Sequence, residues 1–109
     1  MANTFKLKTK ANVGVTTVGI YTAPAATTTV VIGITMSNTS GSGVNVGVGI
    51  TRAGTTEDVK LLKNAPIPQG SSLEFMGGNK VVLETTDTVT VDSDTNNSVD
   101  ATLTIMEIT

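Results

Sequence analysis

The chain has 109 residues, a formal net charge of −2, no cysteine and no histidine, and only 3% aromatic residues. This charge balance gives no general attraction to nucleic acid or to an anionic membrane, and the length suits one domain. Without histidine or cysteine, the chain lacks the commonest general base, metal ligand and thiol nucleophile, so we expect no catalytic residue, no metal and no cofactor.

Branched apolar residues alternate with polar ones along most of the chain, and this period of two predicts β-strands. In the first strand the alternation places Phe5 and Leu7 inward and Lys6, Lys8 and Lys10 outward. The predicted strands, in chain order, are Thr4–Lys10, Gly14–Thr22, Thr28–Ser37, Val44–Arg52, Asp58–Lys63, Ser71–Met76, Lys80–Glu84, Asp87–Asp92 and Ser98–Ile108.

The segment Asp58–Lys63 also fits one helical turn capped by Thr55, because Ser/Thr-x-x-Asp/Glu is a capping-box pattern. We interpret it as a strand, since Ala65-Pro66 leaves too little length for a stable helix, and "NAPIPQG" then forms a proline-stiffened connection. Eight or nine short strands predict an all-β fold, an antiparallel β-sandwich of the Greek-key or jelly-roll type. Residues 1–109 would form this single domain, with 1–10 as an N-terminal edge strand or arm.

The alternation also predicts which side chains form the core. Each chosen residue sits in a strand whose neighbouring positions are polar or small. The predicted core residues are Val30, Ile32, Ile34, Val46, Val48, Leu73, Val89, Leu103 and Ile105.

The strand "VNVGVGI" has branched apolar residues at its even positions, from Val44 to Ile50, and almost no side chains at its odd positions. Glycine inside a strand costs roughly 0.5–1 kcal/mol relative to alanine, so two glycines need a reason. One explanation is a local bend or bulge. The other is a bare sheet face on which another chain docks. The three lysines of the first strand either protect a sheet edge or meet an acidic partner. The candidate protein-contact surface therefore comprises Asn45, Gly47, Gly49, Lys6, Lys8 and Lys10.

The segment "DSDTNNSVD" has the first three ligand spacings of an EF-hand calcium loop at Asp92, Asp94 and Asn96. The pattern then fails, because Asn97 stands in place of the required glycine and Leu103 in place of the bidentate glutamate. We expect a polar hairpin turn there and no specific calcium site.

Three segments resemble a family of small virion structural proteins of tailed phages: "YTAPAATTTVVIGITMSNTS", "LLKNAPIPQGSSLEFMGGNKVVLETTDTVTV" and "SVDATLTIMEIT". The resemblance runs from about Tyr21 to the C-terminus. Its motifs are turn and strand signals, so it assigns no functional residue. The family tends to read "LEAGD" where this chain reads "LETTD" (Leu83–Asp87), which leaves the turn type there open.

The resemblance implies a non-enzymatic virion structural protein, and we expect a capsid decoration or cement protein on the outside of the capsid. Its partners would be other virion proteins, namely the major capsid protein or neck and tail proteins. The bare glycine face also suits packing with copies of itself, most simply in a trimer at a capsid symmetry axis. It would reach the virion from the host cytoplasm, because "MANTFKLKTK" has no apolar signal-peptide region.

Two alternatives remain open at this point. The protein could belong to the neck, tail or baseplate. It could also be a carbohydrate- or receptor-binding module of a fibre, although few aromatic rings are present to bind sugars.

Overall fold

The computed structural model describes residues 3–52, 54, 57–75 and 80–109. These residues form nine strands in two antiparallel sheets, as the sequence predicted for an all-β sandwich. They contain no helix, and therefore none long and apolar enough to cross a membrane. The strands are β1 (Asn3–Val13), β2 (Val18–Thr22), β3 (Thr28–Asn38), β4 (Val44–Arg52), β5 (Glu57–Ile67), β6 (Ser72–Phe75), β7 (Val81–Leu83), β8 (Asp87–Ser93) and β9 (Val99–Ile108).

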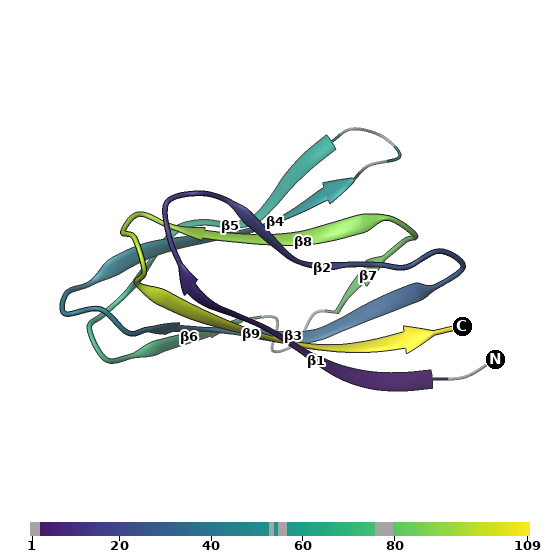
Figure 1. Ribbon diagram of the computed structural model, residues 1–109, viewed down its shortest axis with the longest axis horizontal. Coiled ribbons are helices and arrows are strands. Elements are labelled where there is room, and N and C mark those ends of the chain that lie inside the picture. The colour runs from purple at the N-terminus through teal and green to yellow at the C-terminus, as the bar shows by residue number, and fades with distance from the viewer. Residues whose placement is uncertain (1–2, 53, 55–56, 76–79) are drawn as a thin grey trace.

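The first sheet has the order β1-β9-β3-β6, with β7 also paired to β3, and the second sheet has the order β2-β8-β4-β5. Figure 1 shows the two sheets as stacked layers, with both chain ends at the same end of the sandwich. The strands β1 to β4 alternate between the layers, which is the crossing pattern of a jelly roll. The turn after β8 also crosses between sheets, so the expected hairpin is wrong, although Asn97 there has the expected left-handed φ of 53°.

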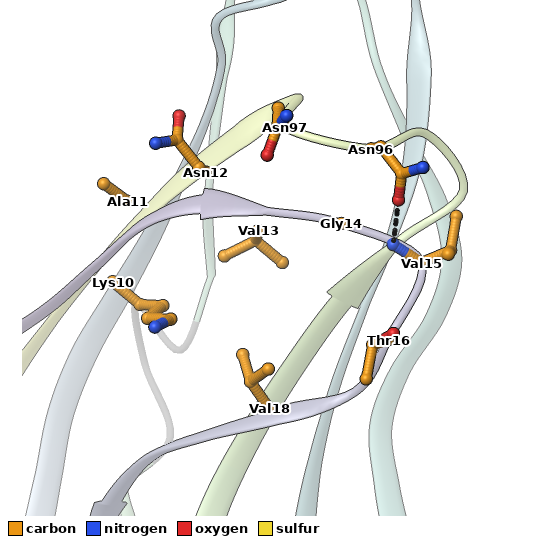
Figure 2. A pocket seen from close by; sticks show the side chains of 10 residues that line it. All are labelled: Lys10, Ala11, Asn12, Val13, Gly14, Val15, Thr16, Val18, Asn96 and Asn97. Carbon is orange, nitrogen blue, oxygen red and sulfur yellow. Dashed lines mark hydrogen bonds between the residues drawn. The ribbon is translucent and has the colours of Figure 1, made fainter.

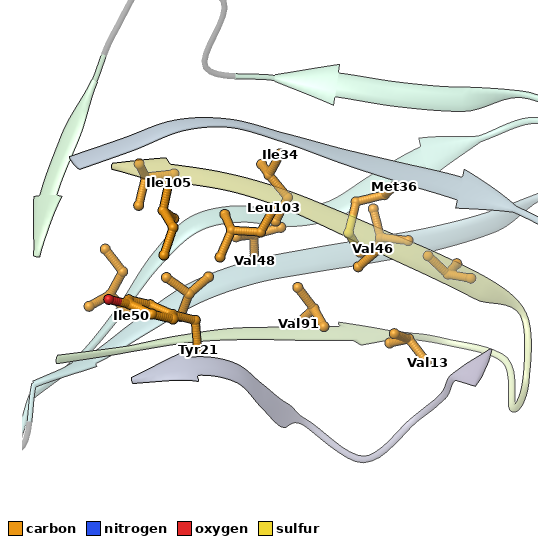
Figure 3. Close-up of a cluster of buried hydrophobic side chains, with 14 of the residues drawn as sticks. Val13, Tyr21, Ile34, Met36, Val46, Val48, Ile50, Val91, Leu103 and Ile105 are labelled. Atoms are coloured by element: carbon orange, nitrogen blue, oxygen red, sulfur yellow. The ribbon is translucent and has the colours of Figure 1, made fainter. Parts of the chain in front are cut away.

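The core lies between the two layers and consists mainly of branched apolar side chains (Figure 3). On β4 the even positions face this core as predicted, since Val44, Val46, Val48 and Ile50 are all at most 8% exposed. The other predicted core residues that the structure confirms as buried are Ile34, Val89, Leu103 and Ile105.

Three of the predicted core residues are not fully buried. The pairing of β3 with β9 shifts between Val31 and Gly33, which marks a β-bulge. The bulge turns Val31 into the core, so Val30 and Ile32 are only half-buried and their predicted facing is wrong. Leu73 is also half-buried and packs against the margin of the core.

The facing of β1 is the reverse of the prediction. Phe5 is 68% exposed and Leu7 is 63% exposed. In the register with β9, Lys6 lies opposite the buried Ile105 and Lys8 opposite the buried Leu103, so the lysines occupy the face that turns toward the other sheet. Because β1 is the edge strand of its sheet, long lysine stems reach solvent at the margin of the core.

The strand β5 is longer than the sequence indicated. It continues through Asn64 and Pro66, which we expected in a connection, and Asn64 has a φ of 54°. Proline is tolerated there because β5 is the edge strand of the second sheet and needs hydrogen bonds on one side only. The alternative helix cap, Thr55, and the last residue of the sixth predicted strand, Met76, lie outside the described residues.

Candidate functional site

The glycine strand that the sequence marked as a bare docking surface is covered by the chain itself. Gly47 and Gly49 occupy the face of β4 opposite the core, yet both are buried. A Cβ atom on Gly47 would lie 2.5 Å from Oδ1 of Asp92, and one on Gly49 would lie 2.9 Å from the carbonyl oxygen of Val59. The expectation that these two glycines face outward as open surface is therefore wrong, whereas Asn45 on the same strand is exposed.

The close contacts at Gly47 and Gly49 occur where the pairing of β4 with β5 is irregular in two places. Val48 lies opposite Leu62, but the next residue, Gly49, lies opposite Lys60, so β5 uses one residue more than β4 in this step. A second register shift precedes Val48. Extra residues bend a strand locally and bring its backbone across its neighbour. The bulge explanation considered from the sequence therefore accounts for the glycines without a second chain.

Asp92 is the side chain that occupies the space left by Gly47. Its Oδ2 accepts a hydrogen bond of 2.9 Å from the Thr17 hydroxyl, and Nζ of Lys60 lies 3.9 Å from the same oxygen. The carboxylate thereby connects β8, β5 and the segment before β2. Gly47 is thus needed for an internal cross-link between strands.

The other two residues of the calcium-like spacing serve separate internal partners. Oδ1 of Asp94 accepts a hydrogen bond of 3.1 Å from the backbone N–H of Asn45, and Oδ1 of Asn96 accepts one of 3.4 Å from that of Val15. Among the described residues, no group of three or more acidic side chains could hold a metal ion. The absence of a calcium site stays a prediction.

The lysines of β1 differ in what they contact. Nζ of Lys6 lies 2.9 Å from Oε1 of Glu107, so its charge is balanced within the chain. Nζ of Lys8 lies 6.0 Å from the centre of the Tyr21 ring, at the outer limit of a cation–π contact. Lys10 is exposed. Contact of the lysines with an acidic partner stays a prediction, and the structure favours Lys10 over Lys6 for it.

A buried polar network joins the two sheets beside these lysines. The Tyr21 hydroxyl donates to Oε2 of Glu107 at 2.6 Å, and its oxygen lies 2.7 Å from Oγ1 of Thr29. Burial, together with the bond to Glu107, raises the pKa of Tyr21 to about 12. The hydrogen bonds from Lys6 and Tyr21 lower the pKa of Glu107. Near neutral pH the tyrosine is thus protonated and the glutamate ionised, and neither is set to exchange a proton.

This network was not predicted, although the sequence carries a signal for it. Glu107 continues the alternation of Leu103 and Ile105, so it is an acid at a core-facing position. A buried acid requires a basic or hydrogen-bonding partner. The basic partners that the sequence offers on the first strand are Lys6, Lys8 and Lys10, and Lys6 is the one that pairs with Glu107.

A second group of charges surrounds Arg52 at the edge of the sandwich. Its Nε lies 3.3 Å from Oδ1 of the buried Asp87, and its Nη2 forms an ion pair with Glu84. Oδ2 of Asp87 also accepts a hydrogen bond of 2.9 Å from the backbone N–H of Glu84. These residues, with Ile50 and Val82, line a cavity of about 340 Å³. Because both carboxylates pair with the guanidinium, the arrangement joins β4 and β8 to the turn after β7 and provides no free acid–base pair.

The turn beside this group resolves the difference from the "LEAGD" pattern. The backbone N–H of Asp87 donates to the carbonyl of Glu84 at 3.0 Å, and Thr86 has a φ of 73°. A positive φ at the third position of a four-residue turn is typical of type II, which favours glycine there. Thr86 therefore adopts a conformation that costs a β-branched residue free energy.

We expect the substitution Thr86→Gly to raise the free energy of unfolding by about 0.5–1 kcal/mol, because relief of the left-handed strain exceeds the added chain entropy. Urea denaturation measures the change. Thr85→Gly is the matched control in the same turn, and it should destabilise the protein, since the described positive-φ residues do not include Thr85. A loss of stability in both variants would contradict the strain argument.

The larger cavity, of about 460 Å³, lies at the connection between β1 and β2. Figure 2 shows Lys10, Val13 and Val18 on one side of it and the amides Asn96 and Asn97 on the other. No aromatic ring and no acidic side chain is among the residues that line it. The cavity is thus a surface hollow rich in side-chain amides, and Lys10 is the one charged residue that lines it.

No protein-family model matches this sequence, and no curated protein matches it either. A solved structure of Bacillus endospore appendages, described as a family of disulfide-linked pili, is similar with a TM-score of 0.57 and 16% sequence identity. The similarity covers 99% of this chain and 87% of that chain. At this level of identity the likeness shows a shared fold, a β-sandwich formed by nearly the whole of the present chain.

Proposed function

We propose that this protein is a non-enzymatic virion structural protein, a decoration or cement protein on the outside of a phage capsid. The observation that carries the proposal is the use of charged side chains within the chain. Three groups of acidic and basic side chains form ion pairs within the chain and join strands of the sandwich. This favours a structural role over a catalytic site. The groups are Lys6 with Glu107, Arg52 with Glu84 and Asp87, and Lys60 with Asp92.

The resemblance of three segments to small virion proteins of tailed phages supports the same role. The pilus protein provides independent support at a coarser level, because its fold serves there as an assembled subunit. The present chain has no cysteine, so it cannot form the disulfide links described for those pili. Its contacts in a particle, with the major capsid protein and with further copies of itself, would therefore be formed without disulfides.

The expected trimer was argued from an open glycine face, and Gly47 and Gly49 no longer support it because they are buried. The proposal of a homo-oligomer therefore requires another surface of the sandwich. Association at the neck, tail or baseplate remains the nearest alternative. A carbohydrate-binding fibre module is weaker, since the cavity beside Asn96 has no aromatic ring for stacking on a sugar.

Cryo-electron microscopy of purified virions of the encoding phage tests the proposal directly. We expect density for the sandwich at regular positions on the outer capsid surface. Density confined to the neck, tail, baseplate or fibres would overturn the decoration role in favour of the corresponding alternative. Absence of the chain from purified particles, measured by mass spectrometry, would overturn the whole virion assignment.

A further inference from the structure

The outer face of the first sheet carries a continuous row of apolar side chains across four strands. Phe5 on β1 lies opposite Met106 on β9, Met106 opposite Val30 on β3, and Val30 opposite Val82 on β7. Residues that pair across antiparallel strands share one face, so all four point away from the core. Leu7, two residues after Phe5, extends the row along β1. We call these five residues the outer apolar row.

The outer apolar row is largely open to solvent. Phe5, Leu7 and Val82 are 68%, 63% and 56% exposed, while Val30 and Met106 are half-buried. Single exposed apolar residues are ordinary, but a contiguous patch of large ones marks an interaction surface. Exposed apolar side chains elsewhere in the described residues, Val15 and Val59, belong to other parts of the fold.

Charge indicates what kind of surface could cover this row. The outward positions beside it on β1, β9 and β3 include Asn3, Thr9, Thr28, Thr102 and Thr104, all of them uncharged. The lysines of β1 and Glu107 of β9 turn to the opposite face, where Lys6 and Glu107 pair. The acids of the outer face, Asp100 on β9 and Glu74 on β6, lie toward the other end of the sheet, opposite Ser37 and Thr35. Against the row itself, a charged partner would lose solvation without gaining a counter-charge. A second copy of the same uncharged row meets no such penalty.

The size of the outer face also fits a second copy of this chain. The three long strands β1, β9 and β3 extend about 33 Å, and the short strands β6 and β7 share the place beside β3. At a strand spacing of about 4.8 Å the whole outer face then measures about 600 Å² on each copy. Two copies would then bury about 1,200 Å² in total, the lower end of the range for specific complexes. Two sheets that pack face to face commonly align their strands to within about 30°.

We propose that the outer apolar row is a self-association surface, on which two copies of this chain pack their first sheets face to face about a two-fold axis. In Figure 1 this is the outer side of the layer formed by β1, β9 and β3, turned away from the second sheet. A two-fold contact brings the same residues of both copies together, so one apolar row supplies both halves of the interface. The proposal goes beyond the virion role, because it holds for the isolated chain in any assembly.

Sedimentation equilibrium of the purified chain over a wide concentration range tests the proposal. We expect a dimer with twice the 11.1 kDa mass of the chain. Phe5→Glu and Val82→Glu, at opposite ends of the row, should each raise the dimer dissociation constant at least about tenfold, because they place like charges in an apolar contact. Val59→Glu is the matched control, an exposed valine on the second sheet, and it should leave the dimer unchanged.

Thermal melting of each variant confirms that the fold is kept, since all three positions are exposed. A wild-type chain that stays monomeric at about 1 mM would overturn the proposal. So would a trimeric mass, or a dimer that Val59→Glu weakens as much as the other two variants do. A monomeric wild type whose incorporation into particles is lost in Phe5→Glu would assign the row to a different protein. These measurements use the purified chain and no virion. A negative result would therefore overturn the dimer and leave the proposed location on the capsid to be tested by microscopy.

Discussion

Replacement of Leu103 by alanine is expected to lower the free energy of unfolding by about 2–5 kcal/mol. Leu103 lies on β9 near the middle of the first sheet, is 0% exposed and pairs with the equally buried Ile34. Figure 3 shows its side chain within the packed layer between the sheets. Removal of three heavy atoms there leaves a cavity that rigid strands cannot close. Total stabilities near 5–15 kcal/mol make such a loss a large fraction of the whole.

The matched variant is Ile32→Ala, which removes a similar side chain from the bulge of β3. Because Ile32 is only half-buried, its loss should be less than about 1.5 kcal/mol. Urea denaturation of both variants measures the two changes. Equal losses would mean that the bulge does not turn Ile32 away from the core, and the described register of β3 would be contradicted.

The second large effect is expected at Gly49. Gly49→Ala should cost about 1–3 kcal/mol, because the new Cβ would lie 2.9 Å from the backbone oxygen of Val59 and 3.2 Å from Oγ1 of Thr90. A backbone oxygen cannot move aside without disturbing the pairing of β4 with β5. Gly47→Ala should cost less, since it meets the side chain of Asp92, which can rotate at the expense of its bond to Thr17.

Gly33→Ala is the control for Gly49→Ala, because a Cβ atom on Gly33 would meet nothing within 4 Å. We expect a change within about 0.5 kcal/mol for this surface position. Melting temperatures and urea midpoints compare the variants. A stable Gly49→Ala protein would reopen the possibility that β4 is bare for the sake of a partner.

The alternation of the sequence predicted the fold class and the facing of β4, β8 and β9, because their core-facing positions carry branched apolar residues at a period of two. It failed at Val30 and Ile32, where a bulge beside Gly33 changes the facing midway along the strand. It also failed on β1, where the rule that apolar residues turn inward assumes that the core covers the whole strand. Phe5 and Leu7 lie on an edge strand instead, and Glu107 draws Lys6 to the inner side.

The candidate contact site was harder to predict, because what covers a glycine depends on distant residues. Asp92 and Val59, which approach Gly47 and Gly49, come from β8 and β5. The sequence alone gave a choice between a bulge and a bare surface. Only the register of β4 with β5 decides between them.

The position of β9 has a consequence for how the chain is made. The strand β9 lies between β1 and β3, so the first sheet lacks its centre until Val99–Ile108 has left the ribosome. Until then β1 and β3 lack the strand that lies between them, and their unpaired backbone groups can pair with other nascent chains. Late closure of such distant segments also slows folding. Production of this protein should therefore be sensitive to synthesis rate and temperature, and shortening of the chain at its C-terminal end should leave an aggregating fragment instead of a smaller folded protein.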